Sequence, residues 1–171
     1  RVNDTQPHFV VETVKRALGS LSGKKIAALG LAYKPDVDDL RESPANEIVH
    51  TLQEEGAQVL AWEPFKPEAQ MPGIKMADSL ETALKDADAI VYVGGISPQL
   101  EGEEMPVNAP GFNGGDRTTI ALPAVQTQMM KALQTTGKPV VFVMMTGSAI
   151  AIPWEDENLP AIVNAWYGGQ S

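Results

Sequence analysis

Cysteine is absent from this chain of 171 residues. Its absence excludes disulfides, thiolate catalysis, iron–sulfur clusters and cysteine-based zinc sites. The two histidines, His8 and His50, lie too far apart in the sequence to indicate a metal site. No apolar run approaches the ~18 residues of a membrane-spanning helix, and no signal peptide opens the chain. We therefore expect a cytoplasmic protein without a metal centre.

Positive charge is also scarce. The chain has 13 basic and 22 acidic side chains, which give a formal net charge of −9. Such an excess of negative charge repels nucleic-acid phosphates and anionic lipids, so we expect neither as a partner. Only three basic residues fall after residue 90: Arg117, Lys131 and Lys138. This change occurs without a proline- or serine-rich linker, which indicates one domain whose two parts have different origins.

Short apolar runs alternate with helical stretches, the pattern of a doubly wound parallel sheet. Glycine and proline mark the predicted helix boundaries, and Asp78 and Glu81 are spaced as a capping box for one helix, predicted to run through Ala87. A long loop is predicted over residues 94–122. The predicted strands cover residues 24–30, 58–62, 74–77, 89–93, 139–145 and 161–166.

These elements predict a single three-layer α/β/α domain over residues 1–171, with a Rossmann-like parallel sheet of five or six strands. The expected strand order is 3-2-1-4-5-6, with the short third strand at an edge. Without pairing of that strand, the order becomes the flavodoxin-like 2-1-3-4-5.

Two stretches of the first half resemble one enzyme family. Residues 1–4 (RVND) and 28–45 (ALGLAYKPDVDDLRESPA) are similar to the C-terminal, UDP-binding domain of UDP-sugar dehydrogenases, in particular UDP-N-acetylmannosamine dehydrogenases. The resemblance covers residues 1–90 and implies that Lys34 contacts a UDP-sugar, with Arg41 beside the same site. An ammonium and a guanidinium suit a diphosphate. We expect no hydride transfer and no cofactor, because the chain lacks a G-x-G-x-x-G motif and the family's catalytic cysteine.

Four stretches of the second half resemble another family, the C-terminal α/β domain of family 3 glycoside hydrolases (β-glucosidases and β-xylosidases). This resemblance covers residues 91–171 and implies that Glu101 matches the acid/base carboxylate, with Glu103 and Glu104 as alternatives. In that family the nucleophilic carboxylate lies on a separate barrel domain, and retaining hydrolysis needs both carboxylates about 5–5.5 Å apart. The stretches are residues 91–102 (VYVGGISPQLEG), 116–126 (DRTTIALPAVQ), 137–147 (GKPVVFVMMTG) and 160–170 (PAIVNAWYGGQ).

The two resemblances meet within residues 87–95, a stretch predicted to be a buried strand. Such a strand needs apolar side chains and backbone pairing rather than a particular lineage. We therefore interpret the chain as an engineered chimera made by fragment recombination, without an evolved catalytic function and hence not an enzyme. Two alternatives stay open: a weak UDP or UDP-sugar binding module, and a glycosidase C-terminal fragment that lacks its nucleophile domain.

Ligands of open α/β sheets bind at the carboxyl ends of the strands, where the strand order reverses. Here that crevice is expected between the strands ending at Gly30 and Val93, so that Lys34 and Arg41 meet Asp116 and the glutamates of residues 101–104. We interpret these charges as a salt-linked or solvated loop cluster, with residual UDP or phosphate binding as the alternative.

Other candidate residues are assigned structural roles. Residues 111–115 are interpreted as a turn-rich loop, and the three tryptophans as packing residues rather than sugar platforms. His50 is expected to be a surface or capping side chain. Apolar surface left by missing neighbouring domains predicts self-association. The tryptophans are Trp62, Trp154 and Trp166.

Overall fold

One parallel sheet organises the computed structural model, which describes residues 6–31, 43–64, 71–96, 108, 110–114 and 116–166. Its strand order is β3-β2-β1-β4-β7-β8. Counted in chain order within this sheet, that is the predicted 3-2-1-4-5-6. The strands are β1 (Lys25–Leu29), β2 (Gln58–Trp62), β3 (Lys75–Met76), β4 (Ala89–Gly95), β7 (Val140–Met145) and β8 (Ala161–Asn164).

The edge strand β3 decides between the two predicted strand orders. It is only two residues long, yet it pairs in parallel with β2 through Leu60 with Lys75 and Ala61 with Met76. The flavodoxin-like order is therefore not adopted.

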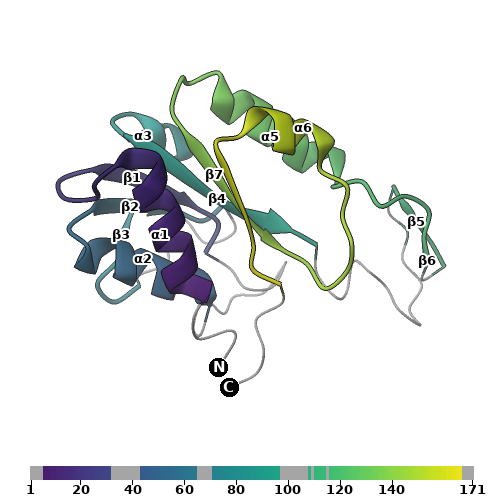
Figure 1. The fold of residues 1–171 in the computed structure, drawn as a ribbon, viewed down its shortest axis with the longest axis horizontal. Helices are drawn as coiled ribbons and strands as arrows, with labels where there is room; N and C mark the ends of the chain where they lie inside the picture. Colours follow the sequence, from purple (N-terminus) through teal and green to yellow (C-terminus); the bar gives the residue numbers. More distant parts are fainter. Residues whose placement is uncertain are drawn as a thin grey trace.

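Helices cover both faces of the sheet, as Figure 1 shows. One face carries α1 (Gln6–Leu18) and α2 (Pro44–Glu54), and the other carries α3 (Leu80–Leu84), α5 (Ala124–Gln134) and α6 (Pro153–Asn158). None of the helices in the described ranges is both long and apolar enough to cross a bilayer.

Local sequence explains where α2 begins. The hydroxyl of Ser43 accepts a hydrogen bond from the backbone N–H of Ala45, and Pro44 occupies the first helical position, where its missing N–H is harmless. Ile48, Val49 and Leu52 form the buried stripe of the helix.

Three local predictions need correction. The cap of α3 is Ser79, whose hydroxyl accepts from the N–H of Thr82, so the capping box at Asp78 is wrong and the helix ends at Leu84, before Ala87. The predicted loop over residues 94–122 contains a small antiparallel hairpin, β5 (Phe112–Asn113) with β6 (Asp116–Arg117). Helix α6 was not predicted, because its sequence PWEDEN is short and lacks an apolar stripe.

Side chains from both halves of the chain share both hydrophobic cores. Under α1 and α2, Val10, Val11 and Val14 belong to one cluster with Val141 and Val163. On the other face, the corresponding cluster joins Leu29 and Ala83 to Leu133 and Phe142. The packing is therefore continuous across the point where the two resemblances meet.

Strand β4 contains that meeting point and lies in the middle of the sheet. It pairs with β1 through Ile26 with Ala89 and with β7 through Ile90 with Val140. Its last residue, Gly95, has a φ of +129°, and a Cβ built there would lie 1.9 Å from the carbonyl oxygen of Met145. Only glycine fits at this end of the strand.

We predict that Gly95→Ala lowers the free energy of unfolding by about 3 kcal/mol or more, because backbone strain and the clash with β7 add together. Gly137→Ala is the matched control, since Gly137 also has a positive φ but its Cβ would meet open space. We expect that control to lose about 1 kcal/mol. Equal losses in urea unfolding would contradict the steric explanation.

Candidate functional site at the carboxyl ends of β1 and β4

The strand order reverses between β1 and β4, and open α/β sheets bind ligands at the carboxyl ends of the strands at such a point. Gly30, directly after β1, has a φ of +85°. A Cβ built on Gly30 would lie 3.0 Å from the carbonyl oxygen of Val93 on β4. The two backbones therefore approach each other closely here, in a conformation that glycine permits.

A buried carboxylate holds the chain as it leaves β1. Glu63 follows β2 directly and is 2% exposed. Its Oε2 accepts a hydrogen bond of 2.8 Å from the backbone N–H of Leu31, which is itself fully buried. This bond fixes the start of the segment that follows β1. Glu63 is not among the site residues predicted from the sequence, although an acidic residue directly after a buried strand is a usable signal.

A glutamine of the second half holds the end of β4. The side chain of Gln126, on α5, accepts from the N–H of Gly95 at 2.7 Å and donates to its carbonyl oxygen at 2.5 Å. Both backbone groups of Gly95 are thereby satisfied at a partly buried position. Gln126 also crowds Gly94, where a Cβ would lie 2.6 Å from Oε1.

A second buried carboxylate joins two helices on the same face of the sheet. Glu155 of α6 is 1% exposed, and its Oε1 accepts from the hydroxyl of Thr127 on α5 at 2.5 Å. This contact positions α6 beside the helix that carries Gln126.

Arg117 ties the β5–β6 hairpin to the loop after β7. Its Nη1 donates to the hydroxyl of Ser148 at 3.0 Å and to the carbonyl oxygen of Ala149 at 2.9 Å. The guanidinium also lies 5.9 Å from the centre of the Phe112 ring. These contacts make Arg117 a structural residue of the long connection between β4 and α5.

The predicted charged site residues lie mostly outside the described part of the chain. Asp116 is the member that the structure places, in β6 opposite Asn113. Of the residues around this site, the structure describes Gly30, Leu31, Glu63 and the end of β4. The predicted residues outside the described ranges are Lys34, Arg41, Glu101, Glu103 and Glu104.

The tryptophans divide into two kinds. Trp62 and Trp154 are partly buried and pack against the second core cluster, which agrees with the packing interpretation. Trp166 is 54% exposed, with a φ of +56°, so a packing role is wrong for this residue. His50 is exposed on α2, as expected. Among the described residues, no group of three or more His, Asp or Glu could hold a metal ion.

Strand β4 also carries a tyrosine with an altered pKa. Burial disfavours the phenolate and raises the pKa of Tyr92 to about 12. The Tyr92 ring packs beside Phe142 of β7, with 5.8 Å between ring centres. This tyrosine is therefore a neutral packing residue beside the crevice at physiological pH.

Comparison with known protein families shows the family to which this chain belongs. The model of the glycosyl hydrolase family 3 C-terminal domain matches residues 8–171. The chain belongs to this family. A xylan 1,4-beta-xylosidase from Xylanibacter ruminicola is 56% identical over 87 residues, which cover 51% of this chain and 10% of that protein.

Relatives from a second group of enzymes match about half of the chain as well. A UDP-N-acetyl-D-mannosamine dehydrogenase from Campylobacter jejuni is 45% identical over 98 residues, 54% of this chain and 24% of that protein. The chain is thus similar to both families, as the sequence motifs indicated, and it spans at most about a quarter of either relative.

Solved structures of both kinds share the fold. An NDP-N-acetyl-D-galactosaminuronic acid dehydrogenase from Methanosarcina mazei has a TM-score of 0.57 and 22% identity, covering 96% of this chain and 30% of that one. A beta-glucosidase from Listeria innocua has a TM-score of 0.56 and 22% identity, and the match covers 88% of this chain and 20% of that one. At this level of identity, the likeness establishes the Rossmann-like α/β fold.

These findings correct one expectation. The chain was expected not to be an enzyme, but the family to which it belongs is a glycosyl hydrolase family, and the relatives in both groups are enzymes by name. The exclusion is therefore wrong. That expectation was based on catalytic elements that the chain lacks, such as the cysteine and the barrel nucleophile. The lack of these elements says nothing of what the residues that are present do in a complete protein.

The raised pKa of Tyr92 predicts a pH dependence of stability. Tyrosine in the unfolded chain ionises near pH 10, while Tyr92 in the folded protein ionises near pH 12. Its contribution is fully present below pH 10 and is lost as the pH rises towards 12. Denaturant unfolding across this range should show a steeper loss for the parent protein than for Tyr92→Phe. Identical pH profiles of the two proteins would contradict a contribution of Tyr92 to the pH dependence of stability.

Proposed function

We propose that the chain is an engineered recombinant of two enzyme fragments, joined within β4, and that residues 1–171 fold as one domain. Two groups of relatives that each match about half of the chain support this proposal. So do the shared cores and the pairing of β4 with β1 on one side and β7 on the other. A natural gene that encodes both halves with the same junction would contradict the engineered origin.

For ligand binding, we propose that the crevice beyond β1 accepts UDP or a UDP-sugar. The observation that carries this proposal is the bond from the Leu31 N–H to buried Glu63, because it holds the backbone three residues before Lys34 in the sequence. Those two side chains supply the positive charge that a diphosphate needs. The similarity of the chain to UDP-sugar dehydrogenases supports the choice of ligand.

Calorimetric titration with UDP at low salt tests this site. We expect saturable binding with a Kd of about 1 mM or below, weakened about tenfold in Lys34→Ala and in Arg41→Ala, because each substitution removes a charge-assisted contact. Lys25→Ala is the matched control, since Lys25 is exposed at the opposite end of β1. A flat trace with the unsubstituted chain would refute UDP binding.

Family membership favours a second candidate function. We propose that Glu101 acts as the acid/base carboxylate of a glycoside hydrolase when a barrel domain supplies the nucleophile. The match of the family over residues 8–171 supports this candidate. The clamp of Gln126 on Gly95 supports it as well, because it fixes the strand from which the segment bearing Glu101 departs.

A domain exchange tests the second candidate. A family 3 β-xylosidase whose own C-terminal domain is replaced by this chain should hydrolyse nitrophenyl β-xyloside. Glu101→Gln should lower kcat about 100-fold or more, because general acid catalysis is lost. Glu157→Gln, at an exposed position on α6, is the control and should leave kcat unchanged. Equal rates for the two variants would contradict the role of Glu101.

A further inference from the structure

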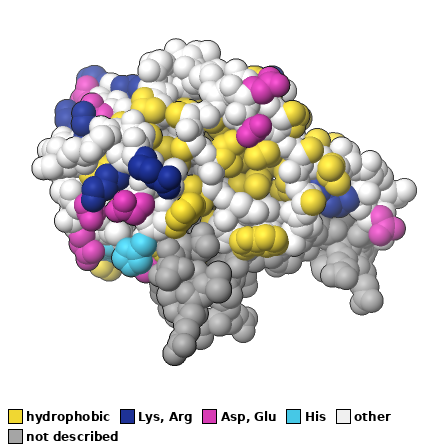
Figure 2. Space-filling view, viewed as in Figure 1, with side chains coloured by type: hydrophobic (Ala, Val, Ile, Leu, Met, Phe, Trp, Pro, Cys, Tyr) yellow, Lys and Arg dark blue, Asp and Glu magenta, His cyan; other side chains and the backbone are white. Residues whose placement is uncertain are grey.

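The end of the β5–β6 hairpin carries an asparagine followed directly by a glycine, Asn113 and Gly114, and the sequence contains no other Asn-Gly pair. The Asn113 side chain is exposed, and its amide forms no hydrogen bond among the described residues. Figure 1 shows β5 and β6 at one end of the molecule, away from the six-stranded sheet. Figure 2, viewed from the same side, shows acidic and basic side chains at the surface of this end. Solvent therefore reaches the Asn113 amide.

Gly114 places a backbone nitrogen next to this amide without a side chain to hinder it. The residue is exposed and has a φ of +62°, a conformation that glycine adopts readily in tight hairpins. A Cβ built there would meet no atom within 4 Å. Within the described part of the chain, the Gly114 N–H donates no hydrogen bond. Its nitrogen is therefore available for reaction with the neighbouring side chain.

Two other asparagines are held in place by hydrogen bonds. Nδ2 of Asn158 donates to the carbonyl oxygen of Trp154 at 2.8 Å. Oδ1 of Asn164 accepts from the backbone N–H of Trp166 at 3.2 Å. Leucine follows the first of these asparagines and alanine the second, so a side chain stands beside each following backbone nitrogen. Asn113 differs from both in its free amide and in its small neighbour.

We propose that Asn113 is a site of spontaneous deamidation, and that the charge it gains loosens the β5–β6 hairpin. In the first step, the backbone nitrogen of Gly114 attacks the side-chain carbon Cγ of Asn113. A bond forms between these two atoms, and the bond from Cγ to Nδ2 breaks. The proton of the Gly114 N–H leaves with Nδ2 as ammonia. The product is a cyclic imide that joins the two residues.

Water then opens the cyclic imide. It adds to one of the two imide carbonyl carbons, the bond from that carbon to the nitrogen breaks, and a proton of the water returns to the nitrogen. Addition at Cγ gives aspartate, whereas addition at the backbone carbon gives isoaspartate, in which the main chain runs through the side chain. Both products carry a new carboxylate. Nothing is oxidised or reduced, and water is the co-reactant.

The new carboxylate has an unfavourable neighbour. Asn113 lies opposite Asp116 in the hairpin, and like charges directly opposite each other destabilise an antiparallel pair. Isoaspartate also adds a carbon to the main chain, which disturbs the pairing of these two residues. Arg117 follows Asp116 and ties the hairpin to the loop after β7. The modification therefore lies beside the contact that attaches the hairpin to the domain.

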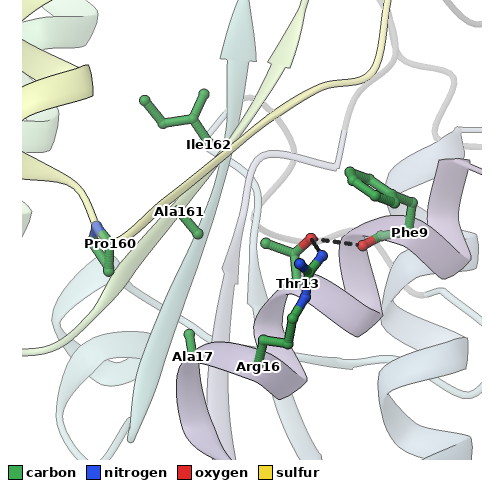
Figure 3. Close-up of a pocket in the computed structure, with 7 residues that line it drawn as sticks. All are labelled: Phe9, Thr13, Arg16, Ala17, Pro160, Ala161 and Ile162. Atoms are coloured by element: carbon green, nitrogen blue, oxygen red, sulfur yellow. Dashed lines mark hydrogen bonds between the residues drawn. The ribbon is translucent and has the colours of Figure 1, made fainter.

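The reaction needs no partner other than water, unlike binding in the groove between α1 and the start of β8. Figure 3 shows side chains that line this groove, among them Phe9, Thr13 and Arg16 of α1. Arg16 donates to the hydroxyl of Thr13 at 3.4 Å, and that hydroxyl donates to the carbonyl oxygen of Phe9 at 2.9 Å. Nothing in the structure shows what covers the groove. Both reacting groups of the deamidation, in contrast, lie in adjacent residues of the hairpin.

Peptide mapping by mass spectrometry, over weeks of incubation at neutral pH, tests the reaction. Conversion at Asn113 should be about tenfold or more faster than at Asn158 and Asn164, which serve as internal controls. Gly114→Ala should slow the conversion about tenfold, because a methyl group beside the attacking nitrogen hinders ring closure. Gly137→Ala is the matched control, since both glycines have a positive φ and open space at the Cβ position. It should leave the rate at Asn113 unchanged.

An Asn113 amide that stays intact would overturn the proposed site. So would equal rates of conversion in the parent protein and in Gly114→Ala.

Hydrogen exchange tests the effect on the hairpin. The reporter is the N–H of Thr118, which donates to the carbonyl oxygen of Gly111 at 2.8 Å. Asn113→Asp reproduces the aspartate product, and its Thr118 N–H should exchange about twofold to fivefold faster than in the parent. Asn113→Ser is the neutral control and should exchange like the parent. Equal exchange in the two variants would overturn the loosening of the hairpin by the new charge.

Discussion

The two-sided pairing of β4 is the constraint on which the rest of the structure depends. Ile90 and Val91 are at most 1% exposed, and their side chains enter the cores on opposite faces. A parallel strand so placed must find backbone partners on both sides, since no water can replace them. The N–H of Asp88 donates to Lys25 of the first half, and Lys138 of the second half donates to the carbonyl oxygen of Ala87. Segments similar to two enzyme families thus meet in one hydrogen-bonded strand.

The crevice at the carboxyl ends of the strands depends on contacts from both sides of β4. Glu63 holds the backbone as it leaves β1, and Gln126 holds the backbone at the end of β4. Each contact satisfies polar groups that would be costly to leave unpaired beside the core. The two contacts come from opposite halves, so both halves hold the backbone at this end of the sheet.

Within the described residues, the sheet ends at β3 on one side and at β8 on the other. Helices pack on both faces of the sheet, over its two hydrophobic cores. At β3 the sheet ends in a short strand with a lysine, whereas at β8 it ends in apolar residues beside α1.

The sequence by itself determined the strands and their order, because apolar runs separated by helical stretches leave few right-handed parallel topologies. Its motifs also indicated both families. Three local features escaped it: the cap at Ser79, one residue from the predicted cap; the short α6, which has no apolar period; and the two-residue strands of the hairpin. Only the tertiary structure revealed the close approach of Gly30 to Val93 and the bond from Leu31 to the buried Glu63. Each of these joins groups far apart in the sequence, and local periodicity carries no information about such distances.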